Sequence, residues 1–527
     1  MAKIWRSLRS KFGLILLIAI SLLSFNAISG LLLSGKPAVF RFHLLGEPMD
    51  LDPAHISGAS GSYLLYNLYR SLYRYRPGIG LVPEGATHCN WQNQKRLTCY
   101  LDPSRKWSDG SAVTATQYVN AFRRLVDPAT RSVQTELLLS LANAREILAG
   151  KLEPSKLGIK ARSSHILTFD LATPDSDFEY RLASPALAPL HSLPIANKSR
   201  AQEVVVNGPY RVAEWGNRGR IRLEANPHYP DAQKRPAVEV LLVDDDTTAL
   251  RLYETGHLNL LRRLPSILID KYRSRADFFQ VPLARFDYLG FGPALKDKPE
   301  LRRALTLALD YDKLKELYHA LGRPGCPSLP IHYMKRPPCY PFDQDEARAL
   351  AANHRYPPLS LSVIGFSKMG GDDIQRGMEW LQGQWSQNLD WNFQLDGREQ
   401  GMYLHQLQVT PAMVFRKGVS LDRPTCLAAL ENFTSQHREN YLKYHNPAFD
   451  LLVERLRLET QAHRRQDICQ QAVETLMADH IMVPLGEIHF SMLQDQNFKG
   501  WEINELNQLD LTQLEVANAE DRANVSN

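Results

Sequence analysis

Two short runs in this chain carry residue types that could do chemistry. Residues 58–62, Gly-Ala-Ser-Gly-Ser, place a serine among glycines, as in a hydrolase nucleophile turn. Residues 244–246 gather three aspartates, whose carboxylates are ligands for a hard cation. Each run also has a structural interpretation: a flexible loop before a helix for the first, and for the second a contact with the positive end of a helix that begins at Thr247.

We favour the structural interpretations, because no established catalytic motif supports the chemical ones. The sequence contains no His-Glu-x-x-His, no Gly-x-Ser-x-Gly and no P-loop. Its 16 histidines show no metal-ligand spacing, and an isolated one such as His489 is better interpreted as structural. We therefore expect no catalytic residue, no metal and no cofactor.

Composition fits a soluble globular chain, with 44% hydrophobic and 23% charged residues. A length of 527 residues allows several hydrophobic cores. The net charge of +5 is small for this length, and no stripe of Lys and Arg alternates with aromatic residues. We therefore expect no nucleic-acid partner.

Residues 1–35 have the pattern of an export signal or membrane anchor. Two lysines and two arginines precede an uncharged run at 12–35, which is long enough to cross a ~30 Å hydrocarbon core. The cations place the amino terminus in the cytoplasm. Two fates stay open: cleavage near residues 27–29, or retention as an anchor, because the apolar run continues through 31–33. In both cases the rest of the chain is periplasmic, free or tethered to the inner membrane.

The elements that must position a site are clearest at residues 101–130. An Asp-Gly turn at 109–110 separates the end of a strand from the start of a helix. Thr114 can cap that helix, because Gln117 three residues later completes a capping box. The apolar residues at helical spacing, which we expect to be buried, are Tyr118, Phe122 and Leu125.

Elsewhere, short alternating runs predict strands and amphipathic runs predict helices. Examples are strands at 221–225 and 238–243, and helices at 301–309 and 451–458. Such a mixture predicts an α/β or mixed α+β fold.

Several of these segments resemble one protein family. Trp-Ser-Asp-Gly at 107–110, Val-Thr-Ala at 113–115 and Asp-Pro-Ala-Thr at 127–130 are similar to the signature of the large peptide-binding receptors of bacterial ABC importers. Further segments that match in the family's order are 46–53, 68–72, 207–210 with Trp215, 302–310 and 446–450. The chain is identified as a member of the oligopeptide- and dipeptide-binding receptors, the family 5 solute-binding proteins.

The resemblance implies two large lobes around a cleft, in the manner of periplasmic binding proteins, with a third lobe inserted into the first. The predicted ranges are 40–82, 188–283 and 490–527 for lobe I, 83–187 for the inserted lobe II, and 284–489 for lobe III.

Six cysteines in an exported chain are compatible with disulfides. Cys89 and Cys99 flank a polar stretch centred near Gln94, so they would face each other across a hairpin. The resembling family commonly has Trp and Phe at these two positions, and the paired departure favours a bridge. The others are Cys326 and Cys339, which bracket a proline-rich loop and could close it, and Cys426 and Cys469, which nothing in the sequence places together.

The resemblance also implies where a ligand lies. An extended ligand is expected between lobes I and III, adding strand-like hydrogen bonds to the main chain of residues 44–49 and 413–420. The predicted ligand-binding residues are Leu45, Gly46, Glu47, Met49, Asn120, Phe415, Arg416, Lys417, Gly418, Ser420 and Asp422.

This site departs from the family's pattern at the amino end of the ligand. Ser420 stands where the family has an aspartate that pairs with the ligand's ammonium group, and Lys417 and Asn120 replace a usual Trp and Tyr. Asp422 could take over, since it would share a face with Ser420 in an extended strand. Alternatively, Arg416 and Lys417 receive a carboxylate or phosphate group. A third interpretation makes these two cations solvated surface charges.

The expected function is that of an exported receptor, acting as a monomer, that binds a peptide or similar extended ligand and presents it to an inner-membrane ABC permease. One alternative is a receptor that senses or buffers its peptide without a role in transport. A periplasmic hydrolase is the least favoured alternative, because the catalytic motifs are missing.

Overall fold

The computed structural model describes most of the chain: residues 38–48, 51–56, 58–192, 198–216, 219–318, 324–327, 338–368 and 372–518. The predicted export or anchor segment, residues 1–35, lies outside these ranges. Within them, no helix combines the length and apolar character that crossing a membrane requires.

A sheet of ten strands forms the frame of the molecule, in the order β14-β13-β15-β12-β16-β11-β1-β10-β9-β8. It contains both parallel pairs, such as β1 with β10, and antiparallel pairs, such as β12 with β16. The predicted mixed α/β fold is confirmed, and the strands expected at 221–225 and 238–243 are β9 and β10. The strand bounds are β1 Val39–Leu44, β8 Tyr210–Gly216, β9 Arg220–Ala225, β10 Ala237–Leu242, β11 Leu260–Leu261, β12 Phe278–Phe291, β13 Val363–Ser367, β14 Gln394–Arg398, β15 Val414–Ser420 and β16 Met482–Gln494.

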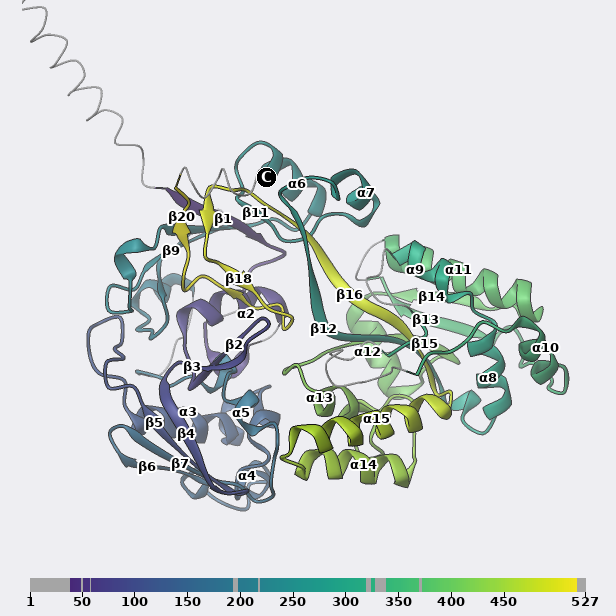
Figure 1. Ribbon diagram of the computed structural model, residues 1–527, viewed down its shortest axis with the longest axis horizontal. Helices are drawn as coiled ribbons and strands as arrows, with labels where there is room; N and C mark the ends of the chain where they lie inside the picture. Colours follow the sequence, from purple (N-terminus) through teal and green to yellow (C-terminus); the bar gives the residue numbers. More distant parts are fainter. Residues whose placement is uncertain are drawn as a thin grey trace, which may run out of the picture.

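Two long strands, β12 and β16, join the two halves of this sheet. Figure 1 shows them running together from the elements around β1 and β11 to the elements around β13 and β15. Their ladder is irregular between Pro282 and Phe286, close to the predicted border of lobes I and III. The lobe boundaries stay predictions, and lobes I, II and III are used below as names for the predicted ranges.

A separate sheet of four strands lies in lobe II, in the order β4-β5-β7-β6. Helix α3 begins directly after Thr114, as predicted, and the backbone N–H of Thr114 donates to the Gln117 side chain; the helix ends at Val126. Tyr118, Phe122 and Leu125 are buried, which confirms the expected face. The bounds are β4 Ala86–Asn93, β5 Arg96–Leu101, β6 Ile159–Ser163, β7 Ile166–Asp170, α3 Ala115–Val126, α4 Ala144–Leu148 and α5 Phe178–Arg181.

The other helices lie in lobes I and III, and α8 and α14 overlap the helices expected at 301–309 and 451–458. In lobe I they are α2 Gly58–Leu68, α6 Asp246–Glu254 and α7 Ile269–Tyr272. In lobe III they are α8 Pro299–Leu307, α9 Tyr311–Tyr318, α10 Gln344–Ala352, α11 Asp372–Leu389, α12 Gln400–Val409, α13 Cys426–Leu430, α14 Pro447–Leu458 and α15 Ala462–Ala478. Short strand pairs add β2 Tyr73–Arg76 with β3 Gly80–Pro83, β17 Phe498–Lys499 with β20 Glu515–Val516, and β18 Glu502–Ile503 with β19 Leu509–Asp510.

Both runs that could have done chemistry belong to helices. The expectation of a loop at residues 58–62 is wrong: they form the first turn of α2, whose Tyr63 and Leu64 are fully buried in the lobe I core. At residues 244–246, Asp245 caps α6 by accepting from the backbone N–H of Thr248 at 2.7 Å, as the helix-end interpretation predicts.

The described residues bury their apolar side chains in separate cores. The largest draws on residues 284–485, and a second draws on residues 72–187. Two further cores lie on the two faces of the lobe I half of the sheet, since the consecutive residues Leu260 and Leu261 belong to different ones.

Three disulfides join all six cysteines. Cys89 and Cys99 are directly opposite each other on β4 and β5, and Cys326 pairs with Cys339, so both predicted bridges are confirmed. The third bridge joins Cys426 of α13 to Cys469 of α15, a pairing that the sequence did not indicate.

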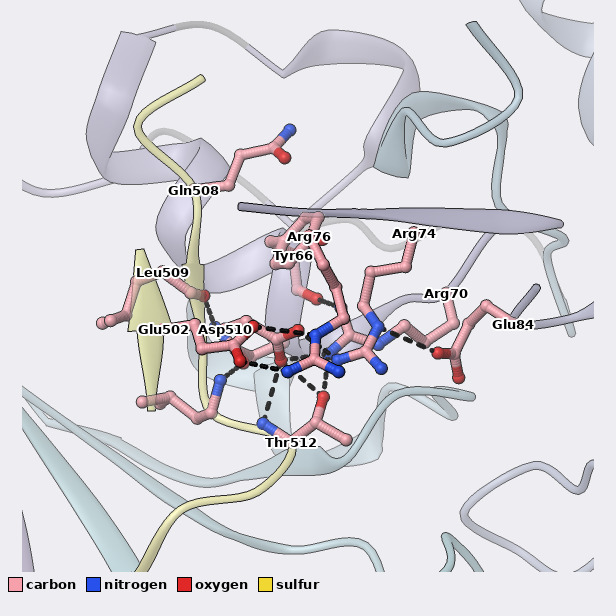
Figure 2. Close-up of polar contacts among 12 residues, drawn as sticks. Tyr66, Arg70, Arg74, Arg76, Glu84, Glu502, Gln508, Leu509, Asp510 and Thr512 are labelled. Carbon is pink, nitrogen blue, oxygen red and sulfur yellow. Dashed lines mark hydrogen bonds and ion pairs between the residues drawn. The ribbon is translucent and has the colours of Figure 1, made fainter. Parts of the chain in front are cut away.

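Buried charges fix the C-terminal segment on lobe I. Asp510 accepts from Arg70 at 2.9 Å and from Arg74 at 2.5 Å, as Figure 2 shows. Burial alone raises the pKa of Asp510, but the charges of Arg70 and Arg74 outweigh burial and hold the pKa well below its ordinary value. Arg76 pairs with Glu502 beside them. This network holds residues 502–512 to β2 and to the segment between α2 and β2, and we interpret it as structural.

Candidate functional site

The half-sheet of lobe III has a partly unpaired edge where β12 crosses from lobe I. β13 pairs with β15 only at Val414 and Phe415. From Arg416 to Ser420, among the described strands, β15 is paired on the β12 side alone. This stretch therefore offers main-chain hydrogen-bonding groups on its outer side.

The main-chain contacts at the two ends of the stretch show which residues face outward. The backbone N–H of Leu421 donates to Ala284 of β12, whereas the carbonyl of Arg416 accepts from the Tyr403 hydroxyl on the other side. Because main-chain groups alternate along a strand, Gly418 and Ser420 present their N–H and C=O groups away from β12.

One face of β12 and β15 carries a buried charge cluster. Arg285 lies opposite Ser420, Asp287 opposite Gly418, and Leu289 opposite Arg416. Directly paired residues share a face, so the cluster that these contacts form, Arg285, Asp287 and Arg416, lies beside Gly418 and Ser420.

Asp287 is the centre of this cluster and is fully buried. Its carboxylate accepts from Arg285 Nε and pairs with Arg416 on the other side. Burial alone raises the pKa of Asp287, but the charges of Arg416 and Arg285 outweigh burial, and the pKa lies below its ordinary value. In this cluster of described residues, one carboxylate thus balances two guanidinium groups, and the cluster keeps a net positive charge.

Gly418 makes room for this cluster. A Cβ atom at residue 418 would lie 2.3 Å from Arg285 Nη2 and 2.5 Å from Asp287 Oδ1. Any side chain there would have to displace the ion pair.

Lys417 lies on the opposite face from Arg416, because successive strand residues alternate. Its ammonium is 5.4 Å from the centre of the Tyr441 ring and 3.8 Å from a carboxylate oxygen of Glu439. The structure therefore groups Arg416 with Arg285, not with Lys417 as the sequence suggested. Phe415 is also turned away from the cluster and is fully buried in the lobe III core.

Asp422 does not lie on the face of Ser420. β15 ends at Ser420, so the alternation that would place Asp422 beside it does not continue. The carboxylate of Asp422 instead meets Arg423 at 2.6 Å and Arg181 of lobe II at 3.6 Å.

The same turn carries a contact between lobes II and III. Asp177 of lobe II is fully buried and accepts from Arg423 at 2.6 Å and from Arg465 at 2.5 Å. The backbone N–H of Ser176 donates to the carbonyl of Arg457 at 3.0 Å. Figure 1 shows α5 of lobe II beside the helices α13, α14 and α15.

The predicted lobe I residues lie just after β1. Leu45 is 41% exposed, and Gly46 has a φ of 114°, a conformation that favours glycine. Glu47 accepts from the indole N–H of Trp215 at 2.8 Å, which fixes the turn. Met49 lies outside the described residues.

Asn120 is exposed on α3, away from the helix face that enters the lobe II core. Among the described residues, no hydrogen bond or ion pair links it to β12 or β15.

Sequence reasoning missed the contribution of β12 and β16. Residues 487–490 are only partly buried, although β16 is fully buried on both sides of them, at 482–486 and at 491–493. Within the described residues, the carboxylate of Glu487 has no hydrogen-bond or ion-pair partner, and burial raises its pKa. Two features of the sequence could have pointed to these strands. One is the single Glu in the largely apolar run Met482–Gln494, and the other is the alternation of Arg285 and Asp287 on β12.

Comparisons with known proteins agree with this architecture. The model of the family described as bacterial extracellular solute-binding proteins, family 5 Middle, matches residues 80–436. The periplasmic murein peptide-binding protein MppA of Escherichia coli is 24% identical over 500 residues, covering 90% of this chain and 92% of that protein. The periplasmic oligopeptide-binding protein OppA of Salmonella typhimurium is 26% identical over 474 residues, covering 83% and 85%.

A solved structure is similar over nearly the whole chain. The unliganded open form of MppA superposes with a TM-score of 0.76 at 22% identity, covering 92% of this chain and 98% of that one. This likeness supports the fold.

Proposed function

This chain belongs to the bacterial extracellular solute-binding proteins of family 5, and from that premise we propose that it is an exported receptor for a peptide or similar extended ligand. The ligand is held between lobes I and III and presented to an ABC permease of the inner membrane. The names of the relatives MppA and OppA, which refer to murein peptides and oligopeptides, support a peptide as the ligand. The protein binds its ligand without turning it over.

The observation that carries this proposal is the half-paired edge of β15. An extended peptide can add to an unpaired strand edge through main-chain hydrogen bonds, which give affinity without a requirement for particular side chains. Residues 416–420 supply such an edge beside the β12 and β16 strands that join the lobes.

A proline at the edge tests the mode of binding. Ser420→Pro removes an outward N–H, whereas the matched control Ser420→Ala keeps it and removes only the hydroxyl. Calorimetry with a peptide that binds the parent protein should show a loss of about tenfold or more for the proline variant, because one main-chain hydrogen bond to the ligand is lost. The alanine variant should bind within a few-fold of the parent.

Two results would overturn the proposal. If a broad peptide library contains no ligand for the purified exported protein, the peptide class is wrong. If Ser420→Pro binds as the parent does, the ligand does not add to this edge.

A further inference from the structure

Two arginines and one aspartate lie on the face of β12 and β15 that carries Ser420. Arg285 lies directly opposite Ser420 on the neighbouring strand, and its side chain is 35% exposed. Arg416 is more deeply buried, with 12% of its side chain exposed, and its Nε–H has no acceptor among the described residues. One carboxylate, that of Asp287, faces the two cations.

Among the described residues, a ligand ammonium finds no unpaired carboxylate on this face of β12 and β15. The carboxylate of Asp287 is enclosed by two arginines, and Asp422 is already paired with Arg423 and Arg181. An ammonium placed beside Ser420 would meet the guanidinium of Arg285 at close range. Like charges at such distances repel each other, and partial burial strengthens the repulsion.

An acidic group meets the opposite conditions. The exposed part of the Arg285 fork can receive a carboxylate, and the Ser420 hydroxyl adjoins it as a further donor. On this basis, and resting on the proposed function, we propose that the subsite formed by Arg285, Arg416 and Ser420 binds a carboxylate of the extended ligand. The preferred ligand is a peptide or peptide-like molecule with an acidic end here, rather than a free ammonium.

Three forms of one short peptide test this proposal: the free amine, the neutral N-acetyl form and the acidic N-succinyl form. Calorimetry with the parent protein should rank the succinyl form first and the free amine last. A charge-assisted hydrogen bond predicts about ten- to hundredfold between the acidic and neutral forms. A matched peptide with a terminal phosphate separates a carboxylate site from a general anion site, and a tighter phosphate complex would overturn the assignment to a carboxylate.

Variants on the two faces of the strands supply the controls. Arg285→Gln should abolish the preference for the acidic form, and Ser420→Asp should reverse it toward the free amine. Lys417→Gln removes a cation of the same strand from the other face and should leave the preference unchanged. Ser420 is exposed, so the Ser420→Asp result does not depend on whether the cluster tolerates the loss of Arg285.

The outcomes separate the two proposals. The short peptide is chosen from those that bind the parent protein in the library screen; if the library contains no ligand, the proposed function fails. If the free amine binds best, or if Ser420→Asp leaves the ranking unchanged, peptide binding stands and the acidic subsite is refuted.

Discussion

Substitution of Asp177 by Asn should loosen the contact between lobes II and III. Asp177 is the fully buried carboxylate that Arg423 and Arg465 share. Arg423 keeps Asp422 and Glu431 as partners after the change, whereas Arg465 has no other ion-pair partner among the described residues. Removal of one member of a buried pair typically costs about 3–5 kcal/mol, and we expect a loss in this range because Arg465 is left buried without a counter-charge.

The measurement is the free energy of unfolding at pH 7, combined with small-angle scattering of the ligand-free protein. Asp175→Asn is the control, because Asp175 is also buried but pairs with Arg181 inside lobe II. Both variants should be less stable than the parent, but Asp177→Asn alone should give a larger radius of gyration. Adding Arg465→Met to Asp177→Asn should recover part of the lost stability, because the unpaired cation is removed.

The pH dependence of the free energy of unfolding gives an independent test of the Asp177 ion pairs. Burial alone raises the pKa of Asp177, but the charges of Arg423 and Arg465 hold it far below its ordinary value. The stabilisation is therefore complete above the unfolded pKa of about 3.9 and is lost as the pH falls toward the lower folded value. The stability difference between the parent and Asp177→Asn should thus begin to shrink below about pH 4 and should keep shrinking as the pH falls further. Equal stability and equal scattering of the two proteins at pH 7 would refute the buried contact.

Three further changes have defined outcomes. Replacing Cys89 and Cys99 by serine should lower the free energy of unfolding by roughly 2 to 3 kcal/mol, because the bridge closes only a short loop. Peptide mapping of the parent without reductant should recover all three linked pairs, and free thiols at residues 89 and 99 would contradict the bridge. His43 is buried with no hydrogen-bond partner among the described residues, and burial followed by the charges of Arg262 and Arg263 lowers its pKa to about 3. Because of this group, the free energy of unfolding of the parent should fall by about 1.4 kcal/mol for each pH unit below pH 6.5. Denaturation curves from pH 7 to 4.5 should show a weaker pH dependence for His43→Leu. Glu487→Gln should raise the melting temperature of the ligand-free protein at pH 7, because burial disfavours the unpaired charge of Glu487 and raises its pKa. This gain should vanish below about pH 4, where the carboxylate is protonated. A lower melting temperature of the variant at pH 7 would mean that the carboxylate has a stabilising partner.

Local patterns predicted the elements whose determinants lie within one segment. The capping pair and the apolar spacing around Thr114 and Tyr118 depend on neighbours a few residues apart, and α3 begins and buries its apolar face as they indicate. The facing cysteines of β4 and β5 are equally local, because a hairpin fixes their register. The bridge from Cys426 to Cys469 depends on how α13 packs against α15, which no local pattern encodes.

The chemistry of the candidate site also depends on contacts between segments that are distant in the sequence. Asp287 and Arg416 are 129 residues apart in sequence, and only the pairing of β12 with β15 brings them together. From β15 alone, Arg416 and Lys417 resemble one basic patch, whereas the strand divides them between two faces. The partner strand therefore decides what lies beside Ser420, and it supplies a cation.

The turn after Ser420 explains why the carboxylate of Asp422 does not lie beside Ser420. The backbone N–H of Leu421 is the last of this run to bond to β12, and Thr425 then caps α13. Between Leu421 and Thr425 the chain leaves the strand. Asp422 and Arg423 therefore form ion pairs with lobe II, whereas Ser420 stays on the half-paired edge of β15. The proposed ligand edge and the contact between lobes II and III are thus separated by a single turn. The ion pair of Arg423 with the buried Asp177 therefore fixes the segment that follows Ser420 and limits how far the end of β15 can move.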